Sequence, residues 1–145
     1  QIRFEGRFEV LYNIPDALMN CRILKFILQP IVENALNHGL EGKPEKGLIT
    51  ICAEVKGNLL YLTVEDNGQG MPPEQVNKLN MYLAETDNDA AEHRKRSIGL
   101  KNVNSRIKMV NGNAYGVTVK SRPDIGTLVT LTLPYCPENQ EDAYV

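Results

Sequence analysis

Hydrophobic and polar residues alternate along five short segments of the chain, a pattern typical of strands that bury one face. These segments cover residues 7–13, 48–55, 59–65, 117–121 and 127–133. The second and third are separated only by polar and small residues that include Gly57-Asn58, a sequence that favours a tight hairpin turn. The pattern therefore predicts a hairpin here, and the last two strands are separated by Pro123-Asp124-Ile125-Gly126.

Three other segments have apolar residues at helical spacing. From Phe26 to His38 they occur at 27, 28, 31, 32, 35 and 36, and Gly39 is suited to end the helix. A short helix is predicted from Pro73 toward Leu83, and another from Gly99 to Val110 with apolar residues at 100, 103, 107 and 110. The stretch from Ala84 to Ser97 is polar, so we expect a mobile loop there.

The order of these elements is strand, helix, two strands, helix, loop, helix and two strands. This order predicts an α+β fold, a two-layer sandwich in which helices cover one face of a mixed, mainly antiparallel sheet. We expect residues 7–136 to form the domain and residues 137–145 to be a polar tail.

Length and composition narrow the class of protein. A chain of 145 residues suits one domain, and its net charge of -2 gives no general attraction to nucleic acid or to an anionic membrane. Three dispersed cysteines favour a reducing cytosol over a disulfide framework. No apolar run approaches the ~18 residues of a membrane span, and no signal peptide is visible. Because the sequence starts without Met, we expect a fragment of a longer protein.

Polar residues cluster at the end of the first predicted helix. Asn34 and His38 are four residues apart and share a helix face, with Glu33 and Asn37 beside them. An Asn carbonyl oxygen is a suitable ligand for magnesium, a hard cation that prefers oxygen. The alternative is that these side chains only cap the helix or face solvent before Gly39.

A glycine-rich turn follows the third predicted strand, in the sequence Asp66-Asn67-Gly68-Gln69-Gly70-Met71. An ionised carboxylate here could accept a hydrogen bond from the exocyclic amine of adenine, whereas the carbonyl of guanine would be repelled. Gly68 and Gly70 would let the backbone approach a base closely, and Met71 could pack on its face. The alternative is an Asx turn that ends the strand and needs no ligand.

Two further segments could contact a nucleotide. Ser97-Ile98-Gly99-Leu100-Lys101-Asn102 would open a helix, whose N-terminus attracts phosphate, although Ser97 could equally be a simple N-cap. Lys101 and Asn102 are candidates for phosphate contact, and the basic residues 94–96 before them could neutralise charge or merely face solvent. Thr127, next to Gly126, could reach a base directly or through water, or simply begin a strand.

Taken together, residues 28–39, 65–71, 97–106 and 126–127 resemble the N, G1, G2 and G3 boxes of the superfamily that contains gyrase, the Hsp90 chaperones, histidine kinases and MutL proteins. The sequences LQPIVENALNHG and SIGLKNVNSRI are most similar to sensor histidine kinases of the YesM/LytS type, and residues 1–6 resemble the linker that leaves their phosphoacceptor helices. The resemblance implies a Bergerat-type ATP-binding fold with ATP and Mg²⁺ as ligands. It implies metal binding by Asn34, catalytic roles for Glu33 and Asn34, and nucleotide contacts from Asn34, Asn37, His38, Asp66, Gly68, Gly70, Met71, Ser97, Gly99, Leu100, Lys101 and Thr127.

Two departures sharpen what this resemblance implies. Gyrase-type ATPases carry a glutamate four residues before the metal-binding Asn, where this chain has Pro30, which cannot act as a general base. Fast hydrolysis is therefore disfavoured. The chain has only two histidines, His38 and His93, neither in an acceptor context. We therefore expect it to bind ATP without phosphorylating itself, and to act on a separate phosphoacceptor domain and, through it, a response regulator.

Other functions remain open from the sequence. The chain could be a serine kinase of the anti-sigma-factor type or an ATPase of the same superfamily, although Pro30 argues against the ATPase. It could also be a degenerate module that binds a partner and uses nucleotide only structurally. For a histidine kinase, the expected location is the cytoplasmic part of a membrane-anchored protein.

Overall fold

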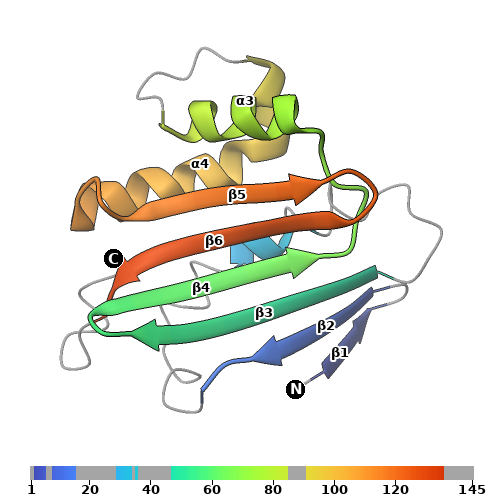
Figure 1. The fold of residues 1–145 in the computed structure, drawn as a ribbon, viewed down its shortest axis with the longest axis horizontal. Helices are drawn as coiled ribbons and strands as arrows, with labels where there is room; N and C mark the ends of the chain where they lie inside the picture. Colours follow the sequence, from blue (N-terminus) through green and yellow to red (C-terminus); the bar gives the residue numbers. More distant parts are fainter. Residues whose placement is uncertain are drawn as a thin grey trace.

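Six strands form one sheet in the computed structural model, which describes residues 2–5, 8–15, 29–33, 35, 47–84 and 91–135 (Figure 1). Each strand ends where a glycine, proline or polar turn interrupts the alternating pattern. The strands are β1 (Ile2–Glu5), β2 (Phe8–Asn13), β3 (Gly47–Lys56), β4 (Leu59–Asp66), β5 (Gly116–Arg122) and β6 (Gly126–Pro134).

The strands lie in the order β1-β2-β3-β4-β6-β5. Four of the neighbouring pairs are antiparallel, and β2 pairs with β3 in parallel. A parallel pair requires a crossover connection, usually helical. The chain between β2 and β3 provides it, and within this connection residues 29–33 are helical. The sheet is therefore mixed and mainly antiparallel, as predicted.

The core lies between one face of this sheet and the helices. Along β4, Leu60, Leu62 and Val64 are buried while the residues between them are partly exposed, and β3 and β6 show the same alternation. From the helix side, Ile31 and Leu100 are almost completely buried, each 1% exposed. Alternation in the strands thus separates a core face from a solvent face.

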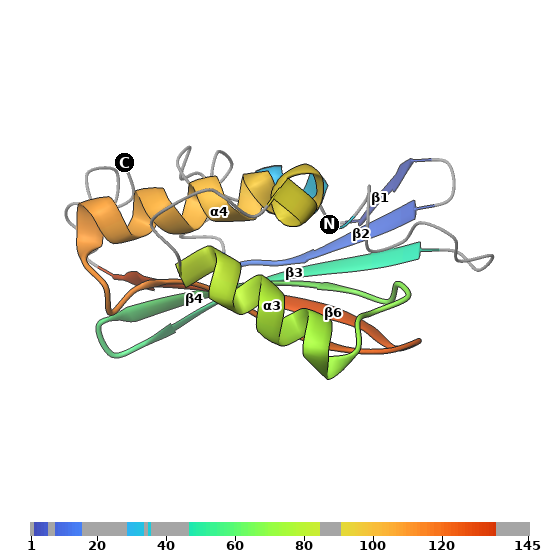
Figure 2. The ribbon, with the colours of Figure 1, turned by 90° about the horizontal axis from the view of Figure 1, so that it is seen from above.

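Two long helices follow β4: α3 (Pro73–Ala84) and α4 (Ala91–Asn111). Seen along the sheet, α4 and the helical residues 29–33 lie over the same face (Figure 2). Helix α3 also protects the edge strand β5, because the Asn80 amide donates to the Val119 carbonyl (2.9 Å) and accepts from the Val119 amide (3.0 Å). An uncovered edge strand would be open to pairing with another chain.

Most elements agree with the expectations from sequence to within one or two residues. The hairpin turn at Gly57-Asn58 is confirmed, with Gly57 at a φ of +60°. Residues 2–5, assigned from sequence to a linker, form the edge strand β1. The prediction of a loop up to Ser97 is wrong for residues 91–97, because α4 already begins at Ala91.

The physical reason for the error at 91–97 is that the sequence AEHRKRS lacks large apolar residues but contains several good helix formers. A helix that packs against the core further along can extend through such a segment on helix propensity alone. The lack of a hydrophobic pattern therefore did not indicate a lack of regular structure.

Candidate functional site

Asp66 ends β4 on the face of the sheet that carries the core. It continues the buried row of Leu62 and Val64, and its side chain is only 5% exposed. Among the residues whose burial is described, it is the only buried acidic residue. A buried carboxylate is costly without hydrogen bonds, and the backbone N–H of Gly68 donates to Asp66 Oδ1 at 2.9 Å. The sequence thus places a well-held acceptor at the end of a strand.

Asn67 fixes the turn that follows by bonding the neighbouring strand. Its backbone N–H donates to the Leu48 carbonyl at 3.2 Å, and its side-chain Oδ1 accepts from the Leu48 N–H at 2.9 Å. The ladder between β3 and β4 is thereby extended by one residue beyond Asp66. The turn starts from a defined position, so the direction of the Asp66 side chain is set by the sheet.

The turn packs directly against the hairpin that joins β5 to β6. Gly70 has a φ of +68°, and a Cβ atom there would overlap the backbone carbonyl of Arg122. The Gln69 carbonyl also accepts a hydrogen bond from the Asp124 N–H at 2.6 Å. Only glycine satisfies both the backbone angle and the close approach at position 70.

Strand register brings together two segments that are about sixty residues apart in the sequence. Asp66 is paired directly with Thr127 across the β4–β6 ladder. Gly126, at a φ of +145°, lies so close to Asp66 that a Cβ atom would overlap the Asp66 carbonyl. Asp66 and Thr127, both proposed from sequence to contact a base, therefore lie side by side.

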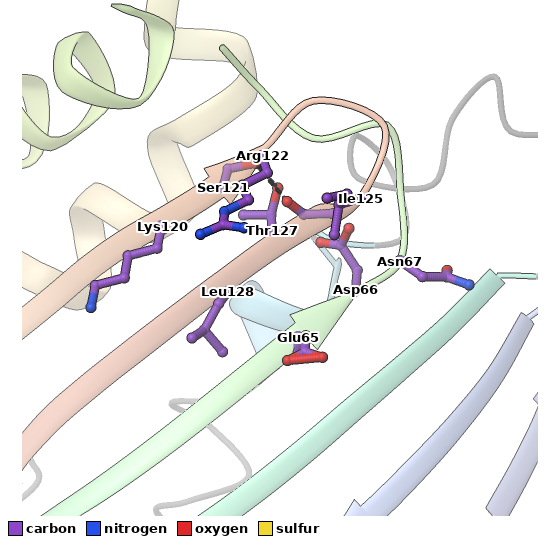
Figure 3. A pocket seen from close by; sticks show the side chains of 10 residues that line it. Glu65, Asp66, Asn67, Lys120, Ser121, Arg122, Ile125, Thr127 and Leu128 are labelled. Atoms are coloured by element: carbon purple, nitrogen blue, oxygen red, sulfur yellow. Dashed lines mark hydrogen bonds between the residues drawn. The ribbon is translucent and has the colours of Figure 1, made fainter. Parts of the chain in front are cut away.

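A cleft of about 270 Å³ opens at this end of the sheet (Figure 3). The lining comes from both faces of the sheet: Glu65, Leu128 and Lys120 are strand partners in a solvent-facing row, whereas Asp66, Thr127 and Ser121 are partners in the core-facing row. The exposed side chain of Ile125 lies at the hairpin. The lining residues of the cleft are Glu65, Asp66, Asn67, Lys120, Ser121, Arg122, Ile125, Gly126, Thr127 and Leu128. Of these, the sequence singled out Asp66 and Thr127 as ligand-contacting side chains.

Met71 leaves the glycine turn and returns to the core. It is half-buried and packs against the hydrophobic cluster, and its backbone N–H donates to Ser121 Oγ at 2.9 Å. Ser121 was missed from sequence. The alternating pattern could have indicated it, because residues 117, 119 and 121 of β5 share the core-facing row. A hydroxyl at 121 is therefore a polar group at an inward-facing position, which needs a hydrogen-bond partner.

The first predicted helix is only partly described. Ile31 and Ala35 are buried, in agreement with the predicted apolar stripe, and Glu33 is exposed, with its Oε1 accepting from Gln29 Nε2 at 3.1 Å. Asn34, Asn37 and His38 lie outside the described residues. Their roles in binding magnesium and phosphate therefore stay predictions.

The third segment differs from the expectation that it opens a helix. Ser97 and Gly99 lie inside α4, six or more residues after its first residue, so Ser97 is not the N-cap and this part of the backbone is not a helix N-terminus. Gly99 faces the first helix instead: a Cβ atom on it would lie 3.4 Å from the Pro30 Cβ. The first and third segments are therefore in contact, through small and apolar groups.

Lys101 is buried rather than exposed to the cleft. Its Nζ donates to the Tyr82 carbonyl at 2.6 Å and lies 4.6 Å from the centre of the Tyr82 ring. Asn104, one turn further along α4, donates to the Leu83 carbonyl at 2.6 Å and accepts from the Val117 N–H at 2.8 Å. These side chains satisfy the last carbonyls of α3, which have no partner within the helix.

No group of three or more His, Cys, Asp or Glu side chains in the described ranges is arranged to hold a metal ion. No helix within those ranges is long and apolar enough to cross a membrane.

Comparison with known proteins agrees with this architecture. Residues 20–137 match the family model described as histidine kinase-, DNA gyrase B-, and HSP90-like ATPase. The chain belongs to this ATPase family. Sensor histidine kinase YesM of Bacillus subtilis is 34% identical over 134 residues, which are 92% of the chain and 21% of YesM. Sensor protein LytS of Staphylococcus epidermidis is 28% identical over 97% of the chain and 23% of LytS.

Solved structures support the same fold. The catalytic domain of histidine kinase ThkA has a TM-score of 0.56 at 18% identity and covers 91% of the chain and 81% of that domain. The histidine kinase domain of a blue-light activated kinase from Erythrobacter litoralis has a TM-score of 0.54 at 16% identity, over 97% of the chain and 60% of that domain. The α+β fold and the similarity to ATP-binding domains of YesM- and LytS-type sensor kinases are thus confirmed. The chain spans about one fifth of the length of YesM and LytS.

Proposed function

We propose that this domain binds Mg²⁺-ATP and supplies the γ-phosphoryl group to a histidine on a separate helical phosphoacceptor domain in two-component signalling. The observation that carries the proposal is the buried carboxylate of Asp66, which lies beside its strand partner Thr127 at the end of the sheet where a cleft opens. Placing an acidic group there is costly for folding alone, which favours a role in recognition.

The groups around Asp66 suit adenine better than guanine. An ionised carboxylate accepts several hydrogen bonds at once. One of them, from the Gly68 N–H, orients the Asp66 group, and the exocyclic amine of adenine supplies another donor. Guanine has a carbonyl at that position, so its oxygen would face the carboxylate and be repelled. Gly68, Gly70 and Met71 would form the wall against which the base lies.

For magnesium and the phosphates, the residues proposed from sequence are Asn34, Asn37 and His38, with Glu33 beside them. Glu33 lies exposed on the helix immediately before Asn34, so an oxygen-rich end of this helix is compatible with a hard cation. Magnesium would neutralise phosphate charge. Ser97, Gly99 and Leu100 would contact phosphate through their backbone, and Lys101 would do so only after leaving the Tyr82 carbonyl.

Pro30 favours a kinase over a hydrolase, because this position in the first helix carries no group that can take a proton from water. ATP would then be held until an acceptor histidine arrives. The partners we propose are the phosphoacceptor domain and, after transfer, a response regulator. We further propose that the domain works in the cytosol, where ATP is available. The protein would contribute alignment and charge neutralisation rather than covalent chemistry.

Calorimetry on the 145-residue chain with a non-hydrolysable ATP analogue, with and without Mg²⁺, tests the proposal. We expect binding that Mg²⁺ strengthens. In Asp66→Asn, loss of a charged acceptor for the adenine amine should weaken binding by at least about tenfold. Glu65→Gln is the matched control, since it removes the neighbouring charge from an exposed residue and should keep the affinity. Absence of binding by the unchanged chain in both conditions would refute the proposal.

A further inference from the structure

Ser121 lies where three parts of the proposed adenine end meet. Its hydroxyl contacts the Met71 N–H at 2.9 Å, the Gly126 carbonyl at 2.7 Å and the Thr127 hydroxyl at 2.9 Å. These groups belong to the glycine turn, to the hairpin and to β6. No other side chain in the hydrogen bonds described for this region joins all three.

The direction of these bonds follows from counting protons. A hydroxyl has one proton to donate and two lone pairs to accept with. The Gly126 carbonyl cannot donate, so Ser121 must use its proton there. The Met71 N–H can only donate, and it takes one lone pair of Ser121. The bond between the two hydroxyls therefore runs from Thr127 to Ser121, which saturates Ser121.

The consequence concerns Thr127. Its single proton is directed at Ser121, so the Thr127 oxygen presents acceptor lone pairs to its other neighbours. Thr127 is the sheet partner of Asp66, whose carboxylate oxygen Oδ1 also accepts a hydrogen bond, from the Gly68 N–H. Ser121 on β5 thus makes the hydroxyl of Thr127, on the neighbouring strand β6, a hydrogen-bond acceptor beside Asp66.

We propose that Ser121 is a positioning residue for nucleotide recognition, which holds the glycine turn against the hairpin and fixes the Thr127 hydroxyl as an acceptor. This inference rests on the proposed function. It differs from a purely structural role because Ser121 acts on binding through Thr127, and the two residues should be energetically coupled when ligand affinity is measured.

The test is a double-mutant cycle on the 145-residue chain, read by calorimetry with the Mg²⁺ complex of a non-hydrolysable ATP analogue. Ser121→Ala should weaken binding about tenfold, which is the change in affinity expected when a binding site loses one hydrogen bond. In a Thr127→Val background the same change should weaken binding by less than about threefold, because the coupled partner is already gone. Ser121→Thr keeps the hydroxyl and should restore affinity to within about threefold of the unchanged chain.

Asn80→Ala is the matched structural control. It removes two hydrogen bonds to the same strand, at Val119, without touching the glycine turn or the hairpin. It should lower the melting temperature while leaving the affinity within about twofold. If Ser121→Ala binds with unchanged affinity, or loses the same tenfold in the Thr127→Val background, the inference is overturned and the proposed function stands. If the unchanged chain binds no nucleotide, the proposed function itself fails, and the inference fails with it.

Discussion

The turn after β4 and the middle of α4 both contain glycines that were expected to contact nucleotide, but the two regions are held in place by different means. At the turn, backbone packs on backbone: Gly70 lies against the Arg122 carbonyl and Gly126 against the Asp66 carbonyl. On α4, Lys101 and Asn104 reach across to the end of α3 with their side chains.

This difference suggests different tasks for the two regions. Where backbone groups pack so closely that no Cβ atom fits between them, the contacts cannot change unless the strands move. The geometry around Asp66 is therefore fixed by the sheet itself. Bonds from a Lys or Asn side chain to a carbonyl can be broken by a change of rotamer. A recognition site for a rigid base suits the first arrangement, and contacts to phosphates suit the second.

The largest effect is expected at the first region, from Gly70→Ala. An added methyl would overlap the Arg122 carbonyl at a φ that alanine disfavours, so the turn and hairpin must separate. We expect the free energy of unfolding to fall by ~4 kcal/mol or more, measured by urea denaturation.

Gly57→Ala is the control for this experiment. Gly57 has a similar φ of +60°, but a Cβ atom there would have nothing within 4 Å. It should cost only about 1–2 kcal/mol, the penalty of the left-handed conformation. Equal losses for the two variants would show that the close packing of the turn contributes nothing.

At the second region, Asn104→Ala should have the next largest effect. It leaves both the Leu83 carbonyl and the Val117 N–H without their buried partner. We expect a loss of ~2–4 kcal/mol in urea denaturation, with nucleotide affinity close to unchanged in the folded protein. Asn102→Ala, at an exposed position of the same helix, should be neutral or slightly stabilising. A large drop in affinity for Asn104→Ala would contradict the separation of the two regions.

The smallest effect is expected from Gly99→Ala. A methyl at 99 would meet Pro30 at an ordinary contact distance of 3.4 Å, and alanine favours a helix interior. The free energy of unfolding should rise by up to about 1 kcal/mol. We expect affinity for the Mg²⁺-ATP analogue to fall several-fold at the same time, because the methyl would lie at the contact between α4 and the first helix, the two segments proposed to hold the phosphates. If stability rises and affinity holds, Gly99 serves helix packing alone.

Periodicity predicted most of the fold, because a strand with one buried face must alternate and a packed helix must show an apolar stripe. It failed at residues 91–97, where helix-forming residues without an apolar stripe extend α4. It also missed β1, a short strand at the sheet edge. Asp66 and Thr127 were found as ligand candidates because their motifs are local in sequence.

The sequence by itself determined the α+β class, the family and the residue types available for chemistry, since these depend on local patterns and motifs. Only the tertiary structure decided which candidates meet. The β4–β6 register places Asp66 beside Thr127, and the β5–β6 register brings Ser121 to the same point. Burial likewise directs Lys101 to the Tyr82 carbonyl. The β4–β6 register and the burial of Lys101 arise from contacts between residues far apart in the chain, which no local pattern encodes.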